Sequence, residues 1–291
     1  MAVRPARTPL PGSEAVAALL SDGRLHLQHG PIDIVAEGWG EAGAVREGYA
    51  RAAGRFASVL SELAAELPAL RVEGAPLRGT IACRMAAAVA PFRPAFITPM
   101  AAVAGAVAEE VLAALAGPGI ARACVNNGGD IALFLAPGQR LSCALAASGG
   151  MDHTTVWAGG PVRGIATSGW RGRSFSFGIA DAVTVLARTA AMADAAATMV
   201  ANAVDLPGHP GIRRRPACGI QADSDLGTRP VTVEVPALSP QDRDAALAAG
   251  LAAAERFRAR GLIEGAAIYL QGGRRVTGGL VLGAPEGEED D

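Results

Sequence analysis

The chain has 291 residues, of which 50% are hydrophobic and 19% are charged, and its formal net charge is -2. This composition predicts a folded protein with a sizeable core, arranged as one large domain or two smaller ones. The small net charge gives no electrostatic reason to expect nucleic acid or an anionic membrane as a partner. The 4 cysteines are far apart and form no C-x-x-C pair, which favours reduced, buried thiols in a cytoplasmic protein.

The beginning of the chain has no apolar run of the kind found in secretory signals, so residues 1–20 are predicted to form a disordered lead. The two most apolar stretches, 85–116 and 179–204, are interrupted by charged residues or prolines, which argues against membrane spans. We therefore expect a cytoplasmic protein with no membrane partner.

The first predicted elements are a hairpin and a long helix. Residues 24–28 and 32–36 flank a His-Gly-Pro turn and are typical of paired strands. From 41 to 67 the apolar residues recur at helical spacing, and Pro68 is expected to end that helix. The apolar segment 80–90 fits a strand or a helix equally well and stays open.

A second helix is predicted over 98–116. Thr98 is its expected N-cap, with Pro99 at the first helical position, where a missing N–H costs nothing. A glycine inside a helix costs up to about 1 kcal/mol against alanine, so Gly105 indicates close packing or the approach of a ligand. Packing is the favoured explanation.

The segment 121–135 predicts two strands joined by the turn Asn126-Asn127-Gly128-Gly129-Asp130. The glycines free the backbone to approach a ligand, and Asn127 and Asp130 have the groups to bind the polar edge of a heterocycle or a ribose. The alternative is that this sequence is simply favourable turn chemistry. The residues themselves leave both open.

Further strands are predicted at 141–147, 154–157 and 162–167. The last strand runs into Thr167-Ser168-Gly169, followed closely by Arg171 and Arg173. Hydroxyls, loose backbone amides and guanidinium groups together suit phosphate oxygens, but the same composition fits a solvated basic loop.

The next strand, at 183–186, leads into an alanine-rich helix with Thr189 as its N-cap and an end near residue 204. No Lys, Arg or Glu occurs from 190 to 204, so the helix is predicted to be buried, and its Asp194 needs a compensating partner. Asp194 and Thr198 lie on one helix face and together suit Mg²⁺ or Ca²⁺. Alternatively, Asp194 accepts backbone N–H groups while Thr198 bonds back to the Asp194 carbonyl.

The rest of the chain predicts a helix capped by Ser239, a closing hairpin around Gly272-Gly273, and a disordered acidic tail at 285–291. Hairpins interspersed with long helices indicate an α+β fold with mostly antiparallel sheets. We expect a single domain over 21–284, with internal duplication left open.

Three motifs in this order, VNNGGD at 125–130, ATSG at 166–169 and ADAAAT at 193–198, resemble the ApbE-like superfamily. Its characterised members are FAD:protein FMN transferases. The segments TPMAAVAGA at 98–106 and GIADAVTVLA at 178–187 are more similar to the short, uncharacterised cytoplasmic branch of that superfamily. The resemblance implies a duplicated architecture like that of the T-fold.

The resemblance also implies a site. It assigns Asp194 and Thr198 to Mg²⁺, completed by a backbone carbonyl from the region 101–105. It places FAD or a related flavin nucleotide beside the two other motifs, which implicates Asn127, Gly128, Gly129, Asp130, Thr167, Ser168 and Gly169.

Departures from the family pattern change the expected reaction. Ala104 stands where the transferases carry lysine, and Glu109 is the candidate for their following acidic residue. The segment 171–181 lacks their histidine and their Asp-Pro-x-Thr-Gly sequence. We therefore expect a Mg²⁺-dependent flavin-nucleotide protein that transfers FMN or a phosphoryl group to an altered acceptor, with Asp181 as base and Arg171 stabilising charge. The alternative is a non-catalytic binder, and a homodimer stays open.

Overall fold

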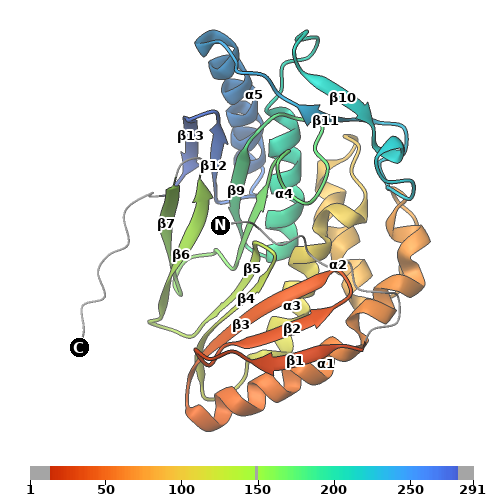
Figure 1. Cartoon of the computed structure of the whole chain (residues 1–291). Coiled ribbons are helices and arrows are strands. Elements are labelled where there is room, and N and C mark those ends of the chain that lie inside the picture. Colours follow the sequence, from red (N-terminus) through yellow and green to blue (C-terminus); the bar gives the residue numbers. More distant parts are fainter. Residues whose placement is uncertain (1–13, 148–149, 281–291) are drawn as a thin grey trace.

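The computed structural model describes residues 14–147 and 150–280, and its centre is a sheet of nine strands in the order β1-β2-β3-β4-β5-β8-β9-β12-β13 (Figure 1). Every adjacent pair in this sheet is antiparallel. The strands are β1 (Val16–Leu19), β2 (Leu25–His29), β3 (Ile32–Gly40), β4 (Ile120–Asn127), β5 (Asp130–Leu135), β8 (Gly164–Ser168), β9 (Ala182–Ala187), β12 (Gly265–Leu270) and β13 (Gly273–Gly278). The predicted antiparallel α+β class is confirmed.

The sheet consists of two halves with the same order of elements. In the first half β2 and β3 pair, helices follow, and β4 returns beside β3 before pairing with β5. In the second half β8 and β9 pair, helices follow, and β12 returns beside β9 before pairing with β13. The halves meet where Ile131 and Ala132 of β5 pair with Ile165 and Gly164 of β8. Duplication of the sequence itself stays a prediction.

The helices pack on one face of this sheet, with α3 against β4 and β5, α4 against β8 and β9, and α5 against β12 and β13. They are α1 (Ala42–Leu70), α2 (Thr80–Val89), α3 (Val103–Leu115), α4 (Ala190–Ala203) and α5 (Pro240–Ala259). Because strand side chains alternate between faces, a smaller core forms on the opposite side. The hairpin β6 (Arg140–Ala147) and β7 (Gly150–Trp157) covers it, contributing Cys143 and Val156.

Several boundaries differ from those predicted. The helix α1 continues past Pro68 to Leu70, because a proline in the last turn removes one donor without ending the remaining bonds, such as that from the Arg71 amide to the Leu67 carbonyl. The segment 80–90, for which the sequence left strand and helix open, forms the helix α2. Thr98 and Pro99 take the predicted N-cap and first positions, but of a separate 3-10 turn, η2 (Pro99–Ala102), which precedes α3. The Thr98 side chain makes no cap hydrogen bond, and its hydroxyl donates to Asp225.

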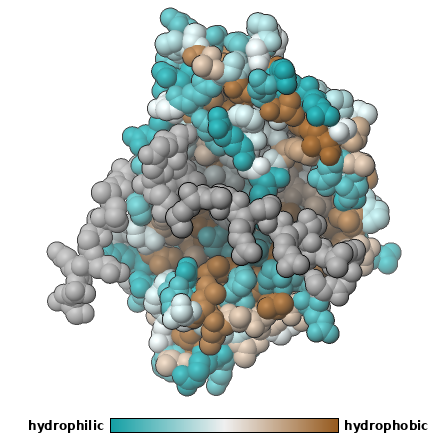
Figure 2. Space-filling view, in the orientation of Figure 1, coloured by the Kyte–Doolittle hydropathy of each residue, from teal (hydrophilic) through white to brown (hydrophobic). Residues whose placement is uncertain are grey.

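The prediction for the beginning of the chain was also wrong in part. The disordered lead was predicted to reach residue 20, but β1 lies within it and pairs with β2. Its four residues are exposed, and Figure 2 shows hydrophobic side chains interspersed among hydrophilic ones on this side of the molecule. Residues 1–13 and the predicted acidic tail at 285–291 lie outside the described residues.

A run of three arginines, Arg213 to Arg215, begins a short strand, β10 (Arg213–Pro216), which pairs with β11 (Pro230–Glu234). This pair contacts the loop after β8, since the Thr232 amide donates to the Ser176 carbonyl at 2.9 Å. A 3-10 turn, η3 (Ala217–Gly219), and another, η1 (Ala90–Phe92), complete the elements described. Among the described residues, no helix combines the length and apolarity needed to cross a membrane.

Candidate functional site

Residues from all three sequence motifs meet where the tip of the β4–β5 hairpin reaches the start of α3 and the middle of the sheet. The Asn127 side-chain amide donates to the Ala104 carbonyl at 3.1 Å, and the Gly105 amide donates to Asp194 Oδ2 at 3.1 Å. The Thr167 amide donates to Asp130 Oδ1 at 3.3 Å. We call these six residues, Ala104, Gly105, Asn127, Asp130, Thr167 and Asp194, the Asp194 cluster.

The close crossing of α3 and α4 makes the contact to Asp194 possible. A Cβ atom on Gly105 would lie 2.3 Å from the Ala190 carbonyl oxygen, so the two helices approach more closely than any larger residue permits. The packing explanation for this glycine is therefore correct, and the same contact brings its amide to Asp194.

The glycines of the β4–β5 turn adopt the left-handed backbone conformation, with φ of 67° at Gly128 and 112° at Gly129. The Gly129 amide donates to Asn126 Oδ1 at 2.8 Å, which closes the turn. Turn chemistry thus explains the backbone conformation of both glycines, and a role for either in binding a nucleotide stays a prediction. Gly128 also leaves room for Arg173, because a Cβ atom there would lie 2.1 Å from Arg173 Nη2.

The two carboxyl groups of the cluster repel each other. Burial raises the pKa of Asp130 to about 7, opposed by the Thr167 amide and by Arg173. Burial and then the charge of Asp130 raise the pKa of Asp194 well above its usual range, opposed by the amides of Gly105 and Ala104. Both residues keep some accessible surface, but protein atoms crowd each carboxyl group. The site therefore disfavours two negative charges and would be stabilised by a cation.

Thr198, the second residue assigned to Mg²⁺, lies one turn beyond Asp194 on the same face of α4 and is half-buried. Within 14–147 and 150–280, no group of three or more His, Cys, Asp and Glu side chains is arranged to hold a metal ion. A cation here would thus depend on one or two carboxylates, supplemented by hydroxyl and carbonyl oxygens.

The Thr167-Ser168-Gly169 segment has structural contacts of its own. Thr167 Oγ1 lies 2.8 Å from Thr184 Oγ1 on β9, and Ser168 pairs with Val183 in the sheet. A Cβ atom on Gly169 would lie 2.4 Å from the Asp181 carbonyl oxygen, so this glycine permits a close approach of two backbone segments. The Thr167 amide is the group in this segment that reaches the cluster.

The residues predicted to be catalytic, Arg171 and Asp181, contact each other. Arg171 Nε lies 3.1 Å from Asp181 Oδ1, and Asp181 Oδ2 accepts the Gln271 amide at 2.6 Å. The Arg171 guanidinium also lies over the Trp170 ring, 4.9 Å from its centroid. These contacts tie the loop after β8 to the β12–β13 turn, and a catalytic role for either residue stays a prediction.

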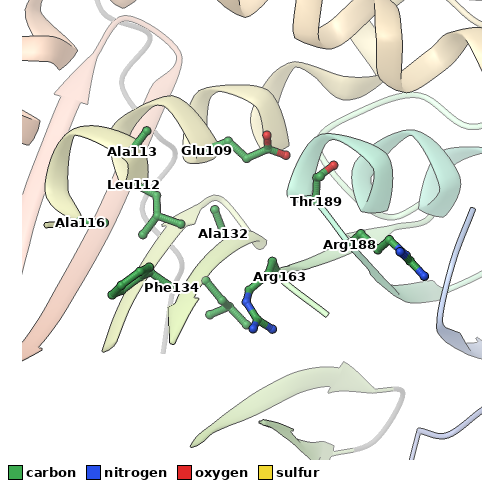
Figure 3. Close-up of a pocket in the computed structure, with 10 residues that line it drawn as sticks. Glu109, Leu112, Ala113, Ala116, Ala132, Phe134, Arg163, Arg188 and Thr189 are labelled. Atoms are coloured by element: carbon green, nitrogen blue, oxygen red, sulfur yellow. The ribbon is translucent and has the colours of Figure 1, made fainter. Parts of the chain in front are cut away.

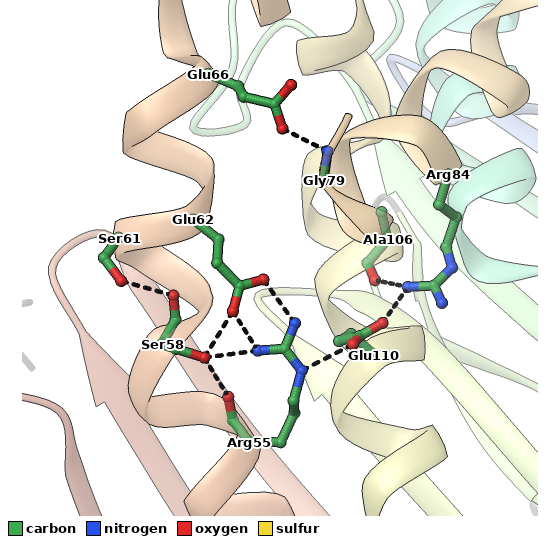
Figure 4. Close-up of polar contacts among 9 residues, drawn as sticks. All are labelled: Arg55, Ser58, Ser61, Glu62, Glu66, Gly79, Arg84, Ala106 and Glu110. Atoms are coloured by element: carbon green, nitrogen blue, oxygen red, sulfur yellow. Dashed lines mark hydrogen bonds and ion pairs between the residues drawn. The ribbon is translucent and has the colours of Figure 1, made fainter. Parts of the chain in front are cut away.

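Glu109 has a role that the motif comparison did not reveal. Its Oε1 accepts the Ala191 amide at 2.7 Å, at the N-terminus of α4, and its Oε2 lies 3.2 Å from Arg84 Nε. Arg84 also binds Glu110, which in turn binds Arg55 of α1 (Figure 4). An acidic residue four positions after Gly105 was visible in the sequence, but its partner on α4 was not.

A cavity of about 240 Å³ lies beside this contact, between α3, β5 and the start of α4 (Figure 3). Leu112 and Phe134 line its apolar side, while Glu109, Arg163 and Thr189 supply polar groups. Its polar groups are already engaged: Arg163 donates to backbone carbonyls, and Thr189 Oγ1 accepts the Met192 amide. No residue of the Asp194 cluster lines this cavity.

Comparison with known proteins gives relatives of two kinds. A UPF0280 protein of Methanothermobacter thermautotrophicus is 42% identical over 120 residues, covering 40% of this chain and 46% of the relative. A UPF0280 protein of Methanothrix thermoacetophila is 41% identical over 112 residues, covering 37% and 46%. The chain thus spans about half the length of these curated relatives.

A crystal structure of the Pseudomonas stutzeri flavinyl transferase ApbE, in its apo form, aligns over 91% of this chain and 93% of that one, at 14% identity and a TM-score of 0.38. A family model described as "AbpE bacteria" matches residues 17–276. Because that match spans most of the sequence, including all three motifs, the chain belongs to this family, within the ApbE-like superfamily that the motifs indicated.

Proposed function

We propose that the protein binds FAD or a related flavin nucleotide together with Mg²⁺ at the Asp194 cluster, and transfers FMN or a phosphoryl group to an acceptor other than that of the flavin transferases. The observation that carries the proposal is the meeting of Asp130 and Asp194, two mutually repelling carboxyl groups, with backbone from two further segments. Family membership supports the flavin nucleotide as ligand.

The oxygen atoms of the Asp194 cluster, together with that of the neighbouring Thr198, fit Mg²⁺, which prefers oxygen ligands. The Asp194 carboxylate, the Thr198 hydroxyl and the Ala104 carbonyl are the groups that would hold it. Asn127 orients the Ala104 carbonyl by its 3.1 Å hydrogen bond, and the Gly105 amide orients the Asp194 carboxylate. When bound, the ion would offset negative charge on the pyrophosphate oxygens.

The remaining groups would bind and orient the nucleotide. The exposed Arg173 lies against Gly128 and would place a positive charge beside phosphate oxygens at the β4–β5 tip. In the transfer, an acceptor oxygen would form a bond to the phosphorus of the FMN half while the bond to AMP breaks, and the acceptor proton would pass to a base. Asp181 is the proposed base, with Arg171 beside it.

A second candidate function is non-catalytic binding of the flavin nucleotide. It is favoured by the contacts of Asp181, whose two carboxylate oxygens are both engaged, by Arg171 and by the Gln271 amide. This carboxylate thus already has a structural role, because it joins the loop after β8 to the β12–β13 turn.

The experiment that separates the candidates is incubation of the full chain with FAD and Mg²⁺, followed by chromatography for AMP. AMP release that stops when EDTA is added supports the enzyme. Tight FAD binding without AMP supports the carrier, and the absence of both results would contradict the flavin proposal altogether. A cytoplasmic location, with a small-molecule nucleotide as partner, belongs to the same proposal.

A further inference from the structure

The face of α3 that carries Gly105 touches α4 at two levels, one helical turn apart. At the first level the Gly105 amide donates to Asp194 Oδ2 at 3.1 Å, and a Cβ atom on Gly105 would lie 2.3 Å from the Ala190 carbonyl oxygen. At the second level Glu109 Oε1 accepts the Ala191 amide at 2.7 Å. Residues four apart lie on one helix face, so Gly105 and Glu109 both contact α4 from the same face of α3.

The Glu109 contact satisfies a group that a helix leaves free. The first amides of α4 have no partner within the helix, and Thr189 Oγ1 accepts one of them, the Met192 amide, at 3.2 Å. Glu109, from another helix, accepts the Ala191 amide and places a negative charge at the positive end of the helix dipole. This makes it a second cap, which joins α4 to α3.

We propose that Glu109 is a positioning residue for the Asp194 cluster: by accepting the Ala191 amide, it fixes the first turn of α4 against α3 and so sets where the Asp194 carboxylate meets the Ala104–Gly105 backbone. Arg84 holds the other oxygen of Glu109 at 3.2 Å, which orients the carboxylate toward α4. The binding test of this inference rests on the proposed function, whereas its structural test does not.

The neighbouring Glu110 provides a matched control. The side chains of Glu109 and Glu110 are 19% and 13% exposed, and both lie on α3 and bind Arg84. Glu110 uses its other oxygen for Arg55 of α1, at 2.8 Å, instead of for α4. Removal of either carboxylate disrupts the same charge network. Only the removal of Glu109 also takes away the hydrogen bond to the start of α4.

The test compares Glu109→Ala, Glu109→Asp, Glu109→Gln and Glu110→Ala in the full chain. The affinity for FAD with Mg²⁺ is measured by calorimetry, and exchange of the Gly105 amide hydrogen is measured by NMR without ligand. We expect Glu109→Ala to weaken binding on the order of tenfold, as loss of a supporting residue behind a metal ligand does. It should also speed exchange at Gly105, because the Asp194 acceptor moves away.

The other variants separate positioning from general stability. Glu109→Asp keeps the charge, but its side chain is too short to reach Ala191, so this variant should behave like Glu109→Ala. If Glu109→Ala does not fold, Glu109→Asp takes its place in the test. Glu109→Gln keeps an acceptor oxygen and should restore most of the affinity and the slow exchange. Glu110→Ala should lower the melting temperature with both readouts unchanged.

Two outcomes would overturn the inference: exchange at Gly105 that stays at the wild-type rate in Glu109→Asp, or an equal acceleration in Glu110→Ala. If the wild-type chain does not bind FAD with Mg²⁺, the proposed function fails, and the exchange comparison still decides the role of Glu109.

Discussion

Asp194 shows how a carboxylate in an unfavourable environment can indicate a binding site. The cost of burying a carboxylate is offset here by backbone amides in part, since the Gly105 amide donates to one oxygen while Asp130 adds repulsion. The sequence suggested either a cation or backbone amides as partners of this group. The amide contact is present, and the repulsion from Asp130 is what leaves a demand for positive charge.

Substitution of Asp194 by asparagine separates these two roles. If the carboxylate binds Mg²⁺, Asp194→Asn should weaken Mg²⁺-dependent FAD binding on the order of tenfold to a hundredfold. The metal-free fold should keep its stability or gain some, because a repelling buried acid is removed. Calorimetric titration and thermal unfolding give the two quantities. Unchanged affinity combined with a lower melting temperature would show that Asp194 has a purely structural role.

The raised pKa values of the acidic pair predict a pH dependence. Asp130 has a pKa of about 7 in the folded state and an ordinary, lower value in the unfolded chain. Between those values the folded state binds more protons, so the stability of the metal-free protein should fall as the pH rises from about 4 to about 7. Mg²⁺ must compete with these protons at low pH. The rise in melting temperature caused by Mg²⁺ should therefore be larger at pH 8 than at pH 5, and equal rises would contradict the assignment.

At the scale of elements, the crossing of α3 and α4 determines the geometry of the site. The sequence predicted both helices and the reason for the glycine between them, but it contained no information on which helix α3 would meet. The structure supplies that answer, because the nearest neighbours of Gly105 outside α3 are Ala190 and Ala191 at the start of α4. Small residues on α4 permit this approach, and Glu109 adds a hydrogen bond from the Ala191 amide between the two helices.

Gly105→Ala tests this crossing. Alanine favours a helix by up to about 1 kcal/mol over glycine, yet here its methyl group would lie 2.3 Å from a carbonyl oxygen, so we expect a net loss of about 1–3 kcal/mol in unfolding free energy. The matched control is Gly54→Ala on α1, where a methyl group meets nothing within 4 Å and should stabilise the protein. Urea denaturation measures both, and a stabilised Gly105→Ala variant would contradict the close crossing.

At the scale of the whole molecule, the two halves of the sheet share one core. Residues of α1, α3, α4 and α5 belong to a single buried cluster on the helical face, together with strands of both halves. The Asp194 cluster lies at this junction, since Asn127 and Asp130 belong to the first half and Thr167 and Asp194 to the second. Formation of the site therefore depends on the docking of the halves.

This shared core predicts a single cooperative unfolding transition. Trp39 lies on β3 in the first half and Trp170 follows β8 in the second, so variants that keep one or the other report on each half separately. Both should give the same urea midpoint, equal to that from circular dichroism. Separate midpoints would mean that the halves unfold as independent units.

Local features of the sequence were sufficient to predict most helices and strands of this protein and to indicate its family. Hydrophobic periodicity and capping residues involve only residues that are close in the sequence, so they predict helices and strands without the fold. The helix caps at Thr189 and Ser239 are confirmed. Three short motifs in order were sufficient to indicate the ApbE-like superfamily. Such features are local, so they are readable without knowledge of the fold.

The contacts between residues distant in the chain could not be predicted in this way, because they depend on how the elements pack. The short strands β1, β10 and β11 were missed because pairing, and not local pattern, makes them strands. The meeting of Asp130 with Asp194, and of Glu109 with the start of α4, joins residues distant in the chain. A carboxylate looks the same in the sequence whatever it faces, and its pKa, its partner and its role depend on the atoms that folding brings beside it.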